Sequence, residues 1–138
     1  MALQATDLVR LAEREEIRRQ EKVKQGEHLV VRAERALKDK NLKQAYDDYL
    51  KALELIPAGT ATATNRQAVL NEFSKTAVDY ARSLIARGNY AEAENVAKTV
   101  LDPQINPTYK PAAQILSQLE KQNYNTTIDP KFAAKRDE

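Results

Sequence analysis

The chain has 138 residues, of which 42% are hydrophobic and 30% are charged, and its formal net charge is only +2 at neutral pH. It has no cysteine, which excludes disulfides and cysteine-based sites, and its single histidine, His28, cannot supply a histidine metal cluster. No apolar run is long enough to cross a bilayer, and the first residues lack the apolar core of a signal peptide. We therefore expect one domain that does not insert into a membrane and that carries no catalytic residue, cofactor or metal.

Apolar residues spaced three and four positions apart predict helices throughout, and no stretch alternates for long enough to predict a strand. The first helix is predicted to begin at Thr6 or Asp7 and to end at Lys40. The helices predicted after it cover residues 42–56, 64–87, 90–101 and 108–121. Residues 58–64 are predicted to form a loop and residues 123–130 a linker, and the end of the chain has the pattern of the first turns of a further helix, which indicates a longer protein.

The first predicted helix is long and strongly charged. Apolar residues recur at multiples of seven, but Glu16 occupies the same series, so the coiled-coil seam is poor. Glu15 with Arg19, and Glu34 with Lys38, have the spacing of favourable helical ion pairs, worth about 0.2–0.5 kcal/mol each. This pattern favours a solvated helix projecting over residues 1–25 and leaves coiled-coil oligomerisation as an alternative. The apolar members of the series are Val9, Val23, Val30 and Leu37.

Two predicted helices have a clear apolar face, which we expect to form the core. The expected core residues are Leu42, Ala45, Tyr46, Tyr49, Leu53 and Ile56 on the second helix, and Val69, Phe73, Ala77, Tyr80, Ala81 and Leu84 on the third.

The second predicted helix also carries two adjacent acidic residues, Asp47 and Asp48. Neighbouring residues of a helix point in different directions, so these two carboxylates do not form a facing acid–base pair.

Residues 26–57 carry small and bulky side chains at the spacing of a stacking helix–turn–helix unit. The small residues let two antiparallel helices approach closely, and the proline ends the second helix. In this pattern the segment resembles a tetratricopeptide repeat. The residues that carry the resemblance are Leu29, Ala33, Ala45, Tyr49, Ala52 and Pro57.

A second, looser copy lies 48 residues further along, over residues 74–103. Asn89 and Ala93 correspond to Asn41 and Ala45, and Gly88 stands at the turn where the first copy has Lys40. About 14 residues are therefore inserted relative to the 34-residue repeat of the family. The second copy also has Tyr80, Ala81 and Leu84 on its first helix and Ala97 and Val100 on its second.

A third, partial copy is expected over residues 106–122, with Tyr109, Ala113 and Leu116 as its bulky–small–bulky series. The resemblance thus implies an all-α fold: a right-handed stack of antiparallel helix hairpins over residues 26–122, with a long N-terminal helix and a C-terminal capping helix. Residues 123–138 are then a linker and the start of a further segment.

Members of this family bind partners in a concave groove lined by the first helix of each repeat. The resemblance implies that eight positions line such a groove here, and that it accepts a helix or an extended protein segment and no small-molecule substrate. The Lys and Asn pattern by which some members grip a carboxylate is absent. The implied groove residues are Glu27, Val30, Glu34 and Leu37 in the first copy and Lys75, Val78, Arg82 and Ile85 in the second.

These features predict a non-catalytic protein-interaction or scaffold module. The alternative is nucleic-acid binding through the basic residues of the first helix, but acidic residues are interleaved with them, so nucleic acid is an unlikely partner. The order of elements is also similar to the N-terminal region of bacterial secretin-like outer-membrane proteins of the type IV pilus or type II secretion class. That similarity implies a periplasmic location and a role in assembling a secretion or pilus complex; without it, the cytoplasm is expected.

Overall fold

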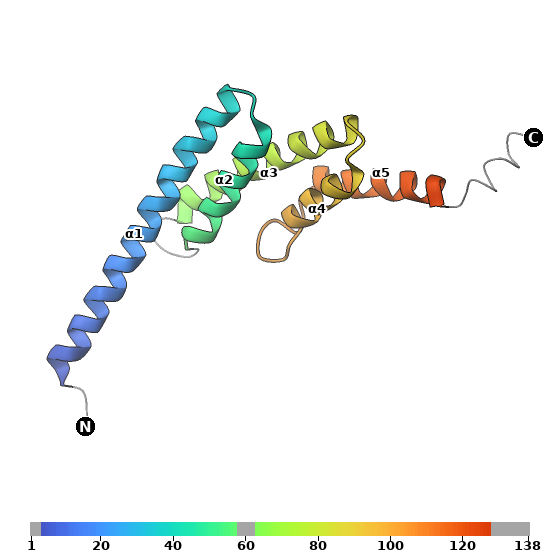
Figure 1. The fold of residues 1–138 in the computed structure, drawn as a ribbon. Helices are drawn as coiled ribbons and strands as arrows, with labels where there is room; N and C mark the ends of the chain where they lie inside the picture. Colours follow the sequence, from blue (N-terminus) through green and yellow to red (C-terminus); the bar gives the residue numbers. More distant parts are fainter. Residues whose placement is uncertain (1–3, 58–62, 128–138) are drawn as a thin grey trace, which may run out of the picture. The chain divides into compact units, whose positions relative to one another are not determined.

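The computed structural model describes residues 4–57 and 63–127, and within them the chain forms five α-helices and no strand (Figure 1). The expected all-α class is confirmed. The helices are α1 (Ala5–Lys38), α2 (Leu42–Leu55), α3 (Ala63–Ala86), α4 (Tyr90–Val100) and α5 (Lys110–Thr127). Residues 58–62 of the predicted loop and the C-terminal residues 128–138 lie outside the described residues, whereas Ala63 and Thr64, also predicted to be in the loop, begin α3.

The ends of α5 differ from the prediction. The helix starts at Lys110, two residues later than expected, and it continues to Thr127 through five residues that were assigned to a linker. No glycine or proline occurs between residues 122 and 127, so nothing interrupts a helix that gains one hydrogen bond for each residue added. Polar composition alone was therefore a poor signal for the end of this helix.

The chain divides into two compact units, Met1–Phe73 and Ser74–Glu138. The division falls inside α3, a helix of 24 residues, or about 36 Å at 1.5 Å per residue. A helix of that length has room to contribute to two separate cores, which the apolar periodicity of the sequence does not reveal.

In the first unit, α1 and α2 form an antiparallel hairpin with small residues between them. Ala33, Ala45 and Ala52 are fully buried, and Tyr49 is only 1% exposed. Gly26 is also buried, and a Cβ atom added to it would lie 2.6 Å from Cγ1 of Ile56. The end of α2 therefore packs directly on the backbone of α1 at Gly26.

The start of α3 is tied to α2 within this unit. Arg66 donates from Nε to the carbonyl oxygen of Ile56 at 2.9 Å and from Nη2 to that of Leu53 at 3.5 Å. These bonds satisfy carbonyl groups that the end of a helix leaves without intrahelical partners. The rings of Tyr46 and Phe73 stack with centroids 5.4 Å apart.

The two helix hairpins close with equivalent turns. In the first, Lys40 has a positive φ of 59° and Asn41 N–H donates to the carbonyl of Ala36 at 2.8 Å; in the second, Gly88 has φ 82° and Asn89 N–H donates to Leu84 at 2.8 Å. Both turns have the six-to-one hydrogen bond that ends a helix at a left-handed residue. The 48-residue correspondence of the turns, predicted from sequence, is present in the structure.

In the second unit, α4 packs on α5, and hydrogen bonds join the end of α3 to α4 and to the segment that follows α4. Tyr80 donates its hydroxyl proton to Oε1 of Glu92 at 2.9 Å, and the amide of Asn106 donates to Oγ of Ser74 at 3.0 Å. The buried residues include the predicted Ala77, Tyr80, Ala81, Leu84, Ala93, Ala97 and Val100.

The predicted register of the fifth helix was wrong by one residue. Up to residue 122, where burial is described, the residues buried on α5 are Ala112, Ile115 and Leu119, whereas Ala113 is exposed and Leu116 is half-buried. A shift of one residue turns the buried face by about 100°. The exposed residues of α5 up to residue 122 are mostly polar.

Candidate interaction surfaces

The α1 half of the predicted groove is accessible. Glu27 and Glu34 are exposed, and Val30 and Leu37 are half-buried beside the fully buried Ala33. The α1 positions thus combine partly exposed apolar side chains with exposed carboxylates.

The buried Tyr49 of α2 interacts electrostatically with Glu34, one of these α1 positions. The pKa of the Tyr49 hydroxyl is raised to about 12, mainly by burial and in smaller part by the carboxylates of Glu72 on α3 and Glu34 on α1. Acidic groups from two helices therefore act on one hydroxyl. Sequence reasoning missed Glu72, which is exposed and lies next to the core residue Phe73.

The α3 half of the predicted groove is only partly accessible. Lys75 and Arg82 are exposed and Ile85 is half-buried, but Val78 is only 4% exposed. We therefore correct the assignment of Val78, which belongs to the core of the second unit together with Ala81. The α1 positions lie in the first unit and the α3 positions in the second.

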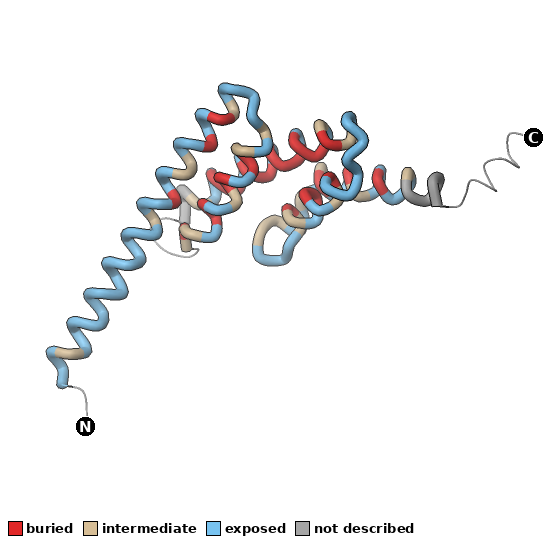
Figure 2. Tube along the Cα trace, viewed as in Figure 1, coloured by how far each residue is buried: buried red, intermediate tan, exposed pale blue. Residues whose placement is uncertain are grey.

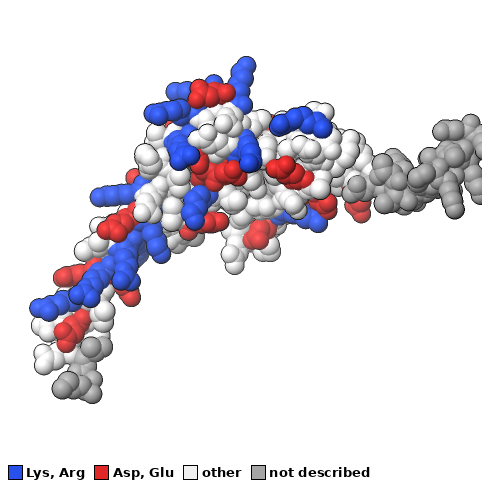
Figure 3. Space-filling view, viewed as in Figure 1, with Lys and Arg blue, Asp and Glu red and all other residues white. Residues whose placement is uncertain are grey.

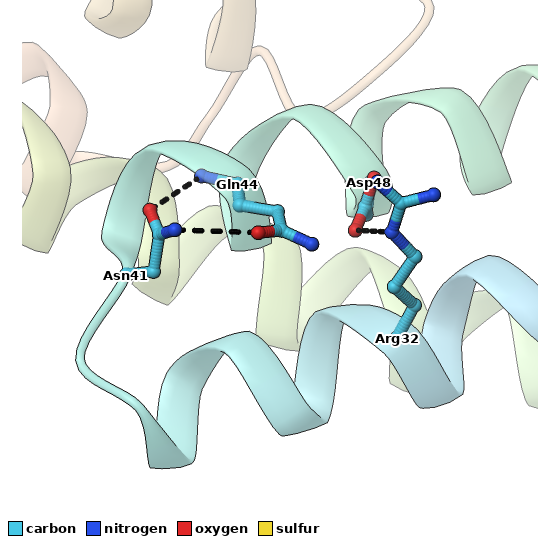
Figure 4. A network of polar contacts seen from close by, with 4 residues as sticks. All are labelled: Arg32, Asn41, Gln44 and Asp48. Atoms are coloured by element: carbon cyan, nitrogen blue, oxygen red, sulfur yellow. Dashed lines mark hydrogen bonds and ion pairs between the residues drawn. The ribbon is translucent and has the colours of Figure 1, made fainter.

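The adjacent carboxylates of α2 have different environments, as expected. Asp47 is exposed and Asp48 is buried, with its Oδ2 atom 3.3 Å from Nε of Arg32 on α1 (Figure 4). The distance suits an ion pair, but the atom receives no well-directed hydrogen bond. Asp48 was missed although its spacing to Ala45 and Ala52 places it on the core face.

A second surface lies on the N-terminal part of α1, ahead of the residues of α1 that pack on α2. Figure 2 shows this part of α1 almost entirely exposed, and its large apolar side chains Leu8, Leu11 and Ile17 are 54%, 45% and 54% exposed. A cleft follows where α2 ends. It is lined by Glu15, Arg18, Arg19 and Lys22 of α1 and by Glu54, Leu55 and Pro57.

One ion pair predicted on this part of α1 is different in the structure. Arg19 contacts Glu16, with 3.3 Å between Nη2 and Oε2, where Glu15 was expected to be its partner. Both spacings are compatible with a helix. Glu15 instead lines the cleft.

Neither a metal-ligand cluster nor a membrane-spanning helix occurs in the part of the chain that the structure describes. His28 is exposed, and over residues 4–57 and 63–127 no three His, Asp or Glu side chains are grouped to hold a metal ion. In the same part of the chain no helix combines the length and the apolar composition that crossing a membrane requires.

No protein-family model matches the chain, and neither a curated protein nor a solved structure matches it.

Proposed function

We propose that this chain is a non-catalytic protein-interaction module built from tetratricopeptide-like hairpins. The observation that carries the proposal is that two faces of α1 have different environments, one buried and one exposed. Its small residues Ala33 and Ala36 are buried, whereas Glu27 and Glu34, on another face of the same helix, remain exposed. A helix that packs through one narrow face keeps another available for a partner.

The mixed character of this face supports a protein partner. Val30 and Leu37 are half-buried and present part of their apolar surface between the carboxylates of Glu27 and Glu34. Apolar contacts supply most of the binding free energy at such surfaces, and the charges select the partner and its orientation. A partner segment with apolar side chains and basic residues matches the α1 positions.

We extend the proposal to the cellular location of the module, and this extension is supported only by the order of the elements along the chain. A long charged helix followed by imperfect repeats supports a place in a bacterial secretion or pilus complex, at the periplasmic face of the outer membrane. The sequences that flank the chain in its gene test this extension, because a signal peptide upstream and a pore domain downstream are both required by it.

Charge reversal tests the module itself. A protein carrying Glu34→Lys and Arg82→Glu is expected to lose most of the partner that wild-type protein captures from lysate, while its melting temperature changes little because exposed charges contribute little to stability. The matched control reverses Lys43 and Asp47, two exposed charges of α2 outside the predicted groove.

Nucleic acid is the competing partner. Binding to DNA or RNA that falls steeply with salt, and that disappears when four arginines of α1 are neutralised, would overturn the proposal, because phosphate binders release counterions. Moderate salt dependence of protein capture supports it. The four residues are Arg10, Arg14, Arg18 and Arg19.

A further inference from the structure

The lengths of α1 and α2 leave much of α1 uncovered in the first unit. α2 has 14 residues and α1 has 34, so α2 covers less than half of its partner helix. The contact between Gly26 and Ile56 marks where this cover ends. Residues 5–25 of α1, about 32 Å of helix, lie beyond this contact, and only the last residues of α2, Glu54 and Leu55, approach them, at the cleft.

The side of α1 that packs on α2 continues into this uncovered part. Steps of three and four residues back from Gly26 reach Lys22, Arg19 and Glu15, and these line the cleft at the end of α2. Further steps of the same size reach Leu11 and Leu8. The uncovered face is therefore apolar at its outer end, acidic in its middle and basic next to α2.

The order of apolar, acidic and basic residues along this face of α1 is complementary to the same order read in the opposite direction. If two such helices run antiparallel with a two-fold axis near Ile17, residues 15 and 19 of the two copies lie at one level, and so do residues 11 and 23. Glu15 then faces Arg19 of the partner subunit, and Leu11 lies next to the level of Lys22 of the partner subunit, whose aliphatic stem can pack on it. Leu8 reaches the level of Gly26 of the partner subunit, where Leu55 and Pro57 of the partner subunit end the cleft.

We propose that two copies of this chain associate through antiparallel pairing of residues 5–25 of α1. The two-fold axis makes every favourable contact twice, as an isologous interface requires. This association of two copies goes beyond the proposed function, because none of the eight predicted groove positions takes part in it.

The charge of this segment permits the pairing. Residues 5–25 contain six basic residues (Arg10, Arg14, Arg18, Arg19, Lys22 and Lys24) and five acidic ones (Asp7, Glu13, Glu15, Glu16 and Glu21). Two such segments therefore do not repel strongly, and Figure 3 shows charges of both signs interspersed along α1. A parallel pair in register would instead oppose Glu15 to Glu15 and Arg19 to Arg19, which is unfavourable.

Sedimentation of the purified protein over a wide range of concentration tests the proposal without any other partner. A reversible monomer–dimer equilibrium is expected. Replacing Leu8 and Leu11 together by Glu should weaken it at least about tenfold, since two apolar contacts are lost on each side of the axis. Ile17→Glu is the matched control, because Ile17 is equally exposed but lies on the opposite side of α1.

A charge swap tests the register. Glu15→Arg and Arg19→Glu should each weaken association, because each leaves like charges facing one another, and the double variant should restore it. Circular dichroism of every variant checks that α1 remains helical. Wild-type protein that stays monomeric at all concentrations, or a double variant no better than the single ones, would overturn the proposal.

The absence of cysteine from the chain permits a direct test of direction. Residues 12 and 22 lie at one level in the antiparallel pair, so an Ala12→Cys protein mixed with a Lys22→Cys protein should form mixed disulfide dimers faster than either alone. Preferential cross-linking of each variant with itself would contradict the antiparallel arrangement. Because no other protein is present, a failure here leaves the groove proposal untouched.

Discussion

The two helix hairpins close with the same turn geometry but with different residues. Each ends its first helix at a residue of positive φ and accepts a 2.8 Å hydrogen bond from the asparagine that follows, yet that residue is Lys40 in the first hairpin and Gly88 in the second. A left-handed conformation costs a side-chain-bearing residue about 1–2 kcal/mol and glycine almost nothing. The fold therefore tolerates local strain when the helices on both sides pack well.

The helices after the turns differ as well. The side chain of Asn41 accepts a hydrogen bond from the backbone N–H of Gln44 at 3.2 Å, whereas Asn89 makes no such cap. Tyr49 is buried in the first hairpin, and 48 residues later the corresponding buried residue is Ala97. Each of these differences predicts an unequal response to the same change.

The largest effect is expected where the hairpins are alike. Ala45 and Ala93 are both fully buried, so Ala45→Leu and Ala93→Leu should each lower the free energy of unfolding by roughly 1–3 kcal/mol through overpacking. Thermal melting followed by circular dichroism measures this. Ala91→Leu, at an exposed position of α4, is the control and should change little. If Ala45→Leu melts like wild type, the two positions are not equivalent helix crossings.

The free energy of unfolding should depend on alkaline pH through Tyr49, a residue of the first hairpin that has no tyrosine counterpart in the second. Its pKa is about 12 in the folded protein and 10.0 as the ordinary value, so the folded state retains a proton that the unfolded state loses. The stabilisation is complete below pH 10 and is lost between pH 10 and 12, by about 1.4 kcal/mol for each pH unit. Urea titrations at pH 8 and pH 11 should therefore show a smaller loss for Tyr49→Phe than for wild type. An equal loss in both proteins would exclude Tyr49 as the cause.

The turn residues should respond in opposite directions. Lys40→Gly is expected to raise the free energy of unfolding by roughly 0.5–1 kcal/mol, and Gly88→Ala to lower it by about 1 kcal/mol. A Cβ atom at Gly88 meets nothing within 4 Å, so only the backbone opposes it. Chemical denaturation of both variants measures the sign. Lys38→Gly, inside the last turn of α1, is the control and should destabilise. Destabilisation by Lys40→Gly would show that its φ is not strained.

The caps should give the smallest difference. Asn41→Ala removes a hydrogen bond to the start of α2 and should cost about 1 kcal/mol, whereas Asn89→Ala removes none and should cost a few tenths. Melting temperatures of the two variants, compared side by side, test this. Equal costs would mean that both asparagines stabilise their turns by the same means.

Sequence alone determined the features that depend on local spacing. Helices, the two turns and the buried small residues Ala33, Ala45 and Ala93 all follow from periodicity and from the steric demands of a close helix crossing. The equivalence of Lys40 and Gly88 was visible for the same reason, because a turn is specified by the residues next to it.

Tertiary structure decided the features that depend on distant neighbours. Whether Val78 faces a groove or a core, which face of α5 is buried, and where α2 stops covering α1 each depend on helices remote in sequence. Asp48 shows the limit most clearly, since its periodicity predicts burial, but only the approach of Arg32 from α1 compensates its charge. The period of an isolated helix cannot encode which neighbour meets each of its faces.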